Sequence, residues 1–310
     1  MHNSLHSLWW HSQAVRQKPA KLPSSVRFRV PPILLYNIML YLVATPIGNL
    51  QDFSFRALDV LKNCDYILCE DTRHSSILLH EYEIKKPLKS FHMFNEKSEE
   101  ERVIADLKEG KIIGLISDAG TPGICDPGEA LVTRCKKEGI EVRSIPGPCA
   151  WVLALSLSSM NKEKVQFLGF LSKKEKELKK TLAEIFTYSG TSIFYDTPHQ
   201  ILDTLAAIVQ LDPQKPVCIM RELTKKFEEH LEGAAETLLA HFQKERPRGE
   251  MVVLVAGKQE SYEDISPQEH VRFLQKTYDL SLSEAIKVCA ELKGVPKRTI
   301  YNEFHKRDDC

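Results

Sequence analysis

The residues best suited to bind a ligand lie in three turns rich in glycine and proline. The longest follows an apolar run and reads "SDAGTPGIC" (117–125). The other two, "TPIGN" (45–49) and "PGPCA" (146–150), also follow apolar runs. Glycine lets a backbone approach its partner closely, and proline fixes the direction of the chain. Because these turns carry little charge, they favour a ligand that is held by main-chain groups and by shape.

Two charged motifs could supply side-chain chemistry. "EDTRH" (70–74) places Asp71 beside Arg73, and "RELTK" (221–225) places Glu222 near Lys225. Asp71 is equally suited to be the N-cap of a helix, and the other charges suit a solvated surface. The residues alone leave both interpretations open.

The elements that must position these motifs can be read from the apolar pattern. From Leu40 to about Ser159, short apolar runs alternate with helix-like segments, which predicts βαβ units on a mostly parallel sheet. The three turns then fall at the carboxyl ends of strands, where open α/β sheets bind ligands. After the longest turn, Asp126 is predicted as the N-cap of a helix, with Pro127 at the first helical position and Glu129 completing a capping box. The predicted strands of this region are 40–44, 66–70, 112–117 and 141–145.

The remaining chain is expected to form a second α/β domain and a small helical region. We expect domain boundaries at 39–160, 161–258 and 263–310, the last with three short helices. In the second domain, strands are predicted at 165–171, 191–196, 216–220 and 249–257, with a further short one at 228–233, and helices at 174–187, 198–210 and 234–243.

Residues 1–38 are expected to be a disordered or mis-annotated extension. They hold five basic and no acidic side chains, and they resemble a translated transfer-RNA gene. Together with the apolar run "ILLYNIMLYLVA" (33–44), they have the pattern of a secretory signal peptide. However, that run is too short to span a bilayer, and cleavage after it would remove the first predicted strand. We therefore expect the folded chain to start at Met39, in the cytoplasm and away from membranes.

Several classes of protein find no support in the sequence. The phosphate-binding pattern G-x-x-x-x-G-K-[ST], the dinucleotide pattern G-x-G-x-x-G and the hydrolase pattern G-x-S-x-G do not occur. The eight cysteines show no C-x-x-C and no zinc-site spacing, so we expect free thiols and no metal site. Beyond residue 38, acidic side chains outnumber basic ones by five, and this charge balance does not indicate nucleic-acid binding.

Seven motifs occur here in the order and spacing of one family. The chain resembles the ribosomal RNA small subunit methyltransferase I family, a member of the tetrapyrrole (precorrin) methylase superfamily, over about residues 39–305. The motifs are "LYLVATPIGNLQDFSFRALDVL", "CEDTRHSSILL", "LISDAGTPGICDPGEALV", "IPGPCAWVLALSLSS", "FLGFLSKK", "IFYDTPHQ" and "RELTKKFEEHLEG".

The resemblance implies a fold, an activity and partners. The implied fold is α/β, with two α/β domains of the tetrapyrrole methylase type, the methyl donor in the cleft between them, and a small C-terminal helical region. The implied activity is S-adenosylmethionine-dependent 2′-O-methylation of a cytidine in the decoding region of 16S rRNA. The implied partners are small-subunit rRNA or the assembled 30S subunit, and a second copy in a homodimer.

The resemblance also implies site residues. Asp71 and Glu222 are the candidate bases, and Lys225 or Arg73 could hold a phosphate or lower the pKa of the attacking hydroxyl. Cys149 stands where the family commonly has serine, which weakens any hydrogen bond there but keeps the size. The residues expected to line the donor site are Thr45, Pro46, Gly48, Asn49, Ser117, Asp118, Ala119, Gly120, Thr121, Pro146, Gly147, Pro148, Cys149 and Ala150.

Two alternatives remain open. The first is an enzyme of the same superfamily that methylates a small molecule or a protein amine, such as a precorrin or diphthine enzyme. The second is a DNA-binding regulator, because "SLSEAIKVCAELKGVPKRTIYNEFHK" resembles a helix-turn-helix. One such unit is weakly specific, and an appendage that docks RNA or supports a dimer explains it better.

Overall fold

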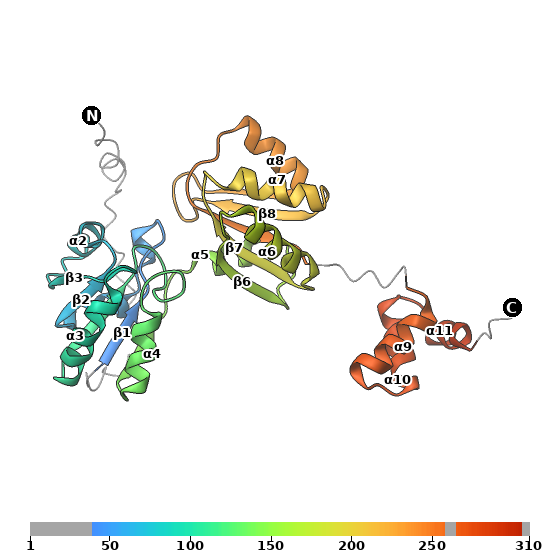
Figure 1. Cartoon of the computed structure of the whole chain (residues 1–310), viewed down its shortest axis with the longest axis horizontal. Helices are drawn as coiled ribbons and strands as arrows, with labels where there is room; N and C mark the ends of the chain where they lie inside the picture. The colour runs from blue at the N-terminus through green and yellow to red at the C-terminus, as the bar shows by residue number, and fades with distance from the viewer. Residues whose placement is uncertain (1–38, 258–264, 306–310) are drawn as a thin grey trace, which may run out of the picture. The chain divides into compact units, whose positions relative to one another are not determined.

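The protein is described by a computed structural model, which covers residues 39–257 and 265–305 (Figure 1). The predictions made for residues 1–38 lie outside the described residues. The described chain forms two five-stranded sheets, each with its own helices, followed by a group of three helices.

The first sheet is entirely parallel, with strand order β3-β2-β4-β1-β5. Strand β1 (Met39–Val43) pairs with β4 (Ile112–Ile116), the central strand, on one side and with the edge strand β5 (Glu141–Ile145) on the other. The short strand β3 (Leu88–Ser90) at the edge was not predicted, because three residues give no visible apolar period. The second strand is β2 (Tyr66–Cys69).

Two helices of this half begin at residues whose side chains cap them. Ser54 caps α1 (Phe55–Asn63), and Asp71 caps α2 (Thr72–Glu81) as the sequence suggested. The other helices are α3 (Glu96–Lys108) and α4 (Glu129–Lys137).

The predicted capping box before α4 is wrong. The residue that precedes this helix is Gly128, with φ of 130°, and no side chain caps it. Asp126 and Pro127 belong instead to the preceding turn, and Asp126 is drawn into a cavity. Tertiary contacts have therefore overridden a local helix signal.

The second sheet is mixed, with strand order β6-β7-β10-β8-β9. Strands β6 and β7 are parallel, whereas β10 runs antiparallel to β7 and β8, and β9 runs antiparallel to β8. These strands are β6 (Val165–Phe170), β7 (Thr191–Asp196), β8 (Pro216–Arg221), β9 (Glu229–Ala234) and β10 (Met251–Val255).

The second sheet is covered on both faces. One face buries a core against α6 (Glu175–Thr187), α7 (Ile201–Leu211) and α8 (Ala235–Lys244). The other face packs against α5 (Ala150–Leu157), which directly follows the last strand of the first sheet. Ile47, from the first predicted turn, joins this second cluster.

Three helices close the described chain, as the sequence predicted. They are α9 (Pro267–Tyr278), α10 (Leu282–Leu292) and α11 (Lys297–Phe304), and they share a small apolar core of their own. Ser266 and Ser281 each form a complete capping box, which explains where α9 and α10 begin. None of the helices described in residues 39–257 and 265–305 is long and apolar enough to span a bilayer.

Candidate functional site

The three predicted turns lie side by side at the carboxyl edge of the first sheet, because β4, β1 and β5 are neighbours there. Hydrogen bonds join them directly. The backbone N–H of Thr45 donates to Gly120 O (2.8 Å), and Gly120 N–H donates to Thr45 O (3.1 Å). The hydroxyl of Thr45 donates to Ser117 O (3.1 Å), and that of Thr121 to Pro148 O (3.1 Å). The turns therefore form one connected rim.

A cavity of about 460 Å³ opens beside this rim. Its first wall contains the turn after β4 from Asp118 to Asp126, together with Cys149 and Ala150. Its second wall comes from the second sheet. The residues of that wall are Phe170, Tyr195, Asp196, Thr197, Pro198, Met220, Glu222, Leu223, Lys225, Gly249, Glu250, Met251 and Val252.

The second wall is also a single sheet edge. Phe170, Tyr195 and Met220 stand at or next to the carboxyl ends of β6, β7 and β8. Because β10 runs the opposite way, its first residue, Met251, lies at that same edge. One edge of each sheet thus borders the cavity.

Glu222 lines the cavity and has an unusual backbone conformation. Its φ is 52°, in the left-handed region that non-glycine residues rarely adopt. One carboxylate oxygen accepts hydrogen bonds from Lys225 Nζ (3.1 Å) and from the backbone N–H of Glu250 (3.2 Å). Gly249 makes room, since a Cβ there would lie 2.5 Å from Cδ of Glu222. Such strain is typical of functional positions.

Lys225 lies between two carboxylates. Its Nζ is 3.1 Å from an oxygen of Glu222 and 3.1 Å from an oxygen of Glu250. Burial acts to lower the pKa of Lys225, but the negative charges of Glu250 and Glu222 outweigh it and raise the pKa. The ammonium therefore stays charged and suits the binding of an anion.

Asp126 is a cavity acid whose pKa is strongly raised. Burial raises its pKa to about 6, and the neighbouring charges of Glu70 and Asp118 add to the effect. Burial raises the pKa of Glu70 as well, and the negative charge of Asp118 adds to this effect. Carboxyl groups titrating near neutral pH are suited to proton transfer.

Asp71 and Arg73 are placed differently from Glu222 and Lys225. They do not belong to the described residues that line the cavity. Their side chains pair with each other (3.0 Å), and that of Arg73 is 91% exposed. The hydrogen bond from Arg73 lowers the pKa of Asp71 to about 2, which makes Asp71 a weak proton acceptor. The catalytic roles assigned to both residues stay predictions.

The residues expected to line the donor site fall into two layers. Those in contact with the cavity are Asp118, Ala119, Gly120, Thr121, Cys149 and Ala150. Those outside its lining are Thr45, Pro46, Gly48, Asn49, Ser117, Pro146, Gly147 and Pro148.

Several residues of the outer layer support the rim from behind. Thr45 and Ser117 are buried and bond to the turn after β4. Gly147 lies against Ala44, and Gly48 lies against Lys225, so that a Cβ at either position would overlap its neighbour. Direct donor contact by these residues stays a prediction.

Sequence reasoning missed most of the second wall. Tyr195 and Asp196 lie within the motif "IFYDTPHQ" at the end of a predicted strand, and that position was an available signal. The buried carboxyl of Asp196 accepts a hydrogen bond from the backbone N–H of Thr197 (2.7 Å). Burial raises its pKa to about 6. Phe170 lies within the motif "FLGFLSKK", to which no site role was assigned, and Gly249 was predicted only as the start of a strand.

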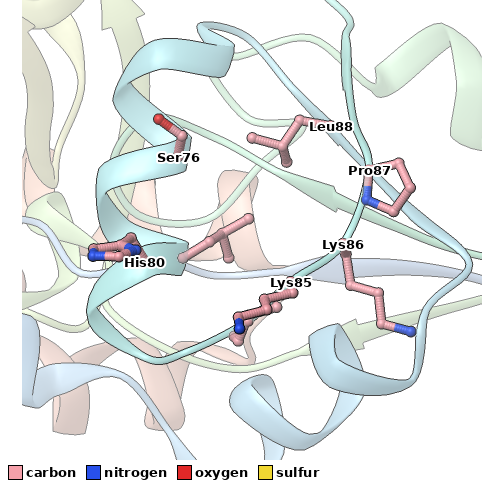
Figure 2. A pocket seen from close by; sticks show the side chains of 8 residues that line it. Ser76, His80, Lys85, Lys86, Pro87 and Leu88 are labelled. Atoms are coloured by element: carbon pink, nitrogen blue, oxygen red, sulfur yellow. The ribbon is translucent and has the colours of Figure 1, made fainter.

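A second hollow, of about 520 Å³, lies on the first half of the chain (Figure 2). Ser76 and His80 border it from α2, and Lys85, Lys86 and Leu88 from the segment that leads into β3. It contains none of the predicted site residues.

The cavity residues fit an S-adenosylmethionine donor. Its volume lies within the roughly 300–1,000 Å³ of small-molecule sites. Of the charged residues described in its lining, Lys225 is the one cation, against Asp118, Asp126, Asp196, Glu222 and Glu250. An acidic lining suits a sulfonium cation and an amino group, and it disfavours a triphosphate. The rim of glycine turns supplies main-chain donors and acceptors.

Several known proteins are similar to this chain in sequence. The family model of the tetrapyrrole (corrin/porphyrin) methylases matches residues 39–239 of the sequence. A Halalkalibacterium halodurans protein named ribosomal RNA small subunit methyltransferase I is 42% identical over 274 residues, which is 86% of this chain and 94% of that protein. A Bacillus subtilis protein of the same name is 39% identical over 276 residues, again 86% and 94%.

A solved structure resembles the chain in fold. The crystal structure of a diphthine synthase superposes with a TM-score of 0.54, covering 70% of this chain and 89% of that one, at 12% identity. At so low an identity the likeness concerns the fold alone.

Proposed function

Because the chain belongs to the tetrapyrrole methylases, and within them to the ribosomal RNA small subunit methyltransferase I family, we propose that it methylates a ribose 2′-hydroxyl of small-subunit rRNA at a cytidine of the decoding region. It is an S-adenosylmethionine-dependent methyltransferase. The observation that supports the RNA substrate best is the 42% identity along 94% of a relative with that name.

The donor supplies a methyl group that is already activated by its positive sulfur. The protein therefore has to position the acceptor, exclude water and remove one proton. Asp118 to Thr121 and Ala150 are proposed to hold the donor at the first wall of the cavity.

Glu222 is proposed as the group that accepts the hydroxyl proton. It lines the cavity, and its carboxylate is fixed by Lys225 and by the backbone of Glu250. Asp71 is the weaker candidate because Arg73 lowers its pKa to about 2. Lys225, charged at neutral pH, is proposed to contact a phosphate of the RNA backbone.

Glu222→Gln tests this role. We expect it to lower kcat for methyl transfer by about 100-fold or more, with little change in donor binding, because general-base catalysis contributes roughly 10²–10⁴-fold. Single-turnover assays on small subunits and calorimetry with the donor give the two quantities. Unchanged turnover would remove Glu222 as the base, and the same assay on Asp71→Asn tests the other candidate.

The substrate itself is tested by mapping 2′-O-methyl marks on small-subunit rRNA from a strain that lacks this gene. We expect one cytidine of the decoding region to lose its mark, and the mark to return with the intact gene but not with Glu222→Gln. A complete set of marks in the deletion strain would contradict the rRNA assignment. Incubation of free rRNA and of assembled 30S subunits with the protein separates the two forms of the substrate.

The partners follow from the same proposal. An rRNA substrate places the protein in the cytoplasm, and we propose a homodimer from the family resemblance. Light scattering of the purified chain measures the oligomeric state directly.

The alternatives have less support. The described residues of the cavity do not favour a small-molecule or protein-amine substrate over RNA. The likeness to diphthine synthase concerns the fold and does not extend to the substrate of that enzyme. For the DNA-binding reading, calorimetry with the donor is decisive, because a regulator without methyltransferase activity gives no heat.

A further inference from the structure

The strand β6 contains a bulge beside the cavity. Phe167 lies opposite Ile193 on β7, whereas Phe170 lies opposite Tyr195, so three residues of β6 span two of β7. Gly169, inside this step, has φ of +64°. A β-bulge inserts one extra residue into a strand and re-aims the side chains beyond it, often next to active sites.

The bulge changes the face on which Phe170 lies. In a regular strand, Phe170 would share the face of Leu168, which packs into the core under α6 and α7. With the extra residue it joins the opposite face, together with Phe167 and Tyr195. Its ring centroid is 5.4 Å from that of Tyr195, which in turn is 5.1 Å from that of Phe167.

Phe170 is thereby moved from a core position to the cavity rim. Its side chain borders the cavity, and the residue is 59% exposed. Ile124, in the opposing turn after β4, also borders the cavity and is 51% exposed. The two walls are adjacent here, since a Cβ built on Gly169 would lie 3.5 Å from Sγ of Cys125.

Isolated exposed apolar residues are common and need no partner. Phe170 differs because a bulge and a left-handed glycine direct it outward, and because a second exposed apolar residue stands on the facing wall. Both sit on the solvent side of a cavity that must admit a macromolecular substrate. The arrangement is typical of a platform for a flat, apolar-faced group.

We propose that Phe170 stacks on the base of the nucleotide that receives the methyl group, with Ile124 on the other side. The inference rests on the proposed function. When a nucleotide leaves the surrounding base stack to bring its ribose into the cavity, its base needs a new partner. Proteins meet that need with aromatic side chains, which accept any base. Phe170 is thus a positioning residue that touches substrate.

The test combines a side-chain change with a base deletion. Phe170→Leu and Phe170→Trp are assayed on small-subunit RNA assembled by ligation around a synthetic segment. In that segment the target nucleotide is either cytidine or an abasic ribose that keeps its 2′-hydroxyl. For cytidine RNA we expect Phe170→Leu to lower kcat/KM roughly ten- to hundredfold, the range expected for one lost base stack. We expect Phe170→Trp to stay near the unmodified protein.

For abasic RNA, the unmodified protein and Phe170→Leu are expected to be equally slow, because no base is present to stack. The KM for the donor should be the same in both. Phe55→Leu, which changes a phenylalanine that is 76% exposed at the start of α1, is the matched control and should behave as the unmodified protein on both RNAs.

Two outcomes overturn the inference. Equal loss on cytidine and abasic RNA, with a raised KM for the donor, would assign Phe170 to the donor's adenine. Unchanged activity of Phe170→Leu on cytidine RNA would leave it without a role. Either result leaves the proposed function intact, which fails separately if the unmodified protein transfers no methyl group to cytidine RNA, either free or reconstituted into 30S subunits.

Discussion

At the scale of single residues, the position of one carboxylate depends on the absence of another side chain. Glu222 adopts a left-handed backbone, and its carboxyl group occupies the space that a side chain at residue 249 would fill. Gly249 is therefore needed for space as well as for its own φ of +76°.

We expect Gly249→Ala to lower methyl transfer by about 100-fold, because displacing a catalytic group by about 1 Å costs that much. Gly139→Ala is the matched control. Gly139 has a similar φ of +71° but nothing within 4 Å of its would-be Cβ. Both variants bear a backbone cost of about 1–2 kcal/mol, and Gly249→Ala also displaces the Glu222 side chain, so denaturant unfolding should show an equal or larger loss for Gly249→Ala. Equal activity of the two variants would contradict the clamping of Glu222 by Gly249.

Asp126 illustrates a residue whose ionisation opposes folding. An ordinary aspartate loses its proton near pH 4, whereas folded Asp126 holds it until about pH 6. Between these values the folded state binds more protons than the unfolded state, so this residue lowers stability as pH rises from about 4 to 6.

Asp126→Asn removes that penalty. We expect the variant to exceed the unmodified protein in unfolding free energy by about 2 kcal/mol at pH 8, from a pKa shift of about two units with some screening. The difference should vanish below about pH 3, where Asp126 is neutral in both the folded and the unfolded state. Urea unfolding at the two pH values measures it, and a variant less stable at pH 8 would show that the ionised carboxylate is stabilised in the fold.

At the scale of elements, helix starts follow local chemistry wherever no tertiary contact competes. Asp71 caps its helix as the sequence suggested, and Ser266 and Ser281 cap theirs through capping boxes. Asp126 does not, because the cavity rim holds its turn in a different conformation. The edge strand β3 and the bulge in β6 were equally invisible, since both depend on which strand lies alongside.

The capping box of α10 gives a prediction at this scale. Ser281→Ala removes a side-chain acceptor from the N–H of Glu284, which typically costs about 1 kcal/mol. We expect amides of α10 to exchange with solvent about fivefold faster, the factor that corresponds to about 1 kcal/mol. Ser283→Ala, inside the same helix but outside the box, is the control. Exchange accelerated equally by both changes would rule out the cap as the cause.

At the scale of the whole molecule, the cavity exists because an edge of each sheet faces it. The turn from Asp118 to Asp126 forms the first wall, and residues from β6, β7, β8 and β10 form the second. A ligand that fills such a site must contact both walls to be enclosed.

Donor binding should therefore protect both walls together. With S-adenosylmethionine at about 100 times its Kd, the bound state is stabilised by about 2.7 kcal/mol. We expect slower hydrogen exchange at 117–126 and also at 195–198 and 249–252, which line opposite walls. Protection of one wall only would contradict a shared site. The segment 175–187, in α6, contributes no residue to the cavity lining and is the internal control.

The sequence by itself determined the alternation of strands and helices, the turns of the first wall and the family, because each is written in neighbouring residues. The tertiary structure decided which of those residues reach the cavity. It placed Asp118 and Glu222 at the cavity but Asp71 outside its lining, and it added Phe170 and Gly249. The physical reason is that a strand's partners, a bulge and the approach of two sheet edges depend on contacts between residues far apart in the chain. Local patterns do not encode such contacts.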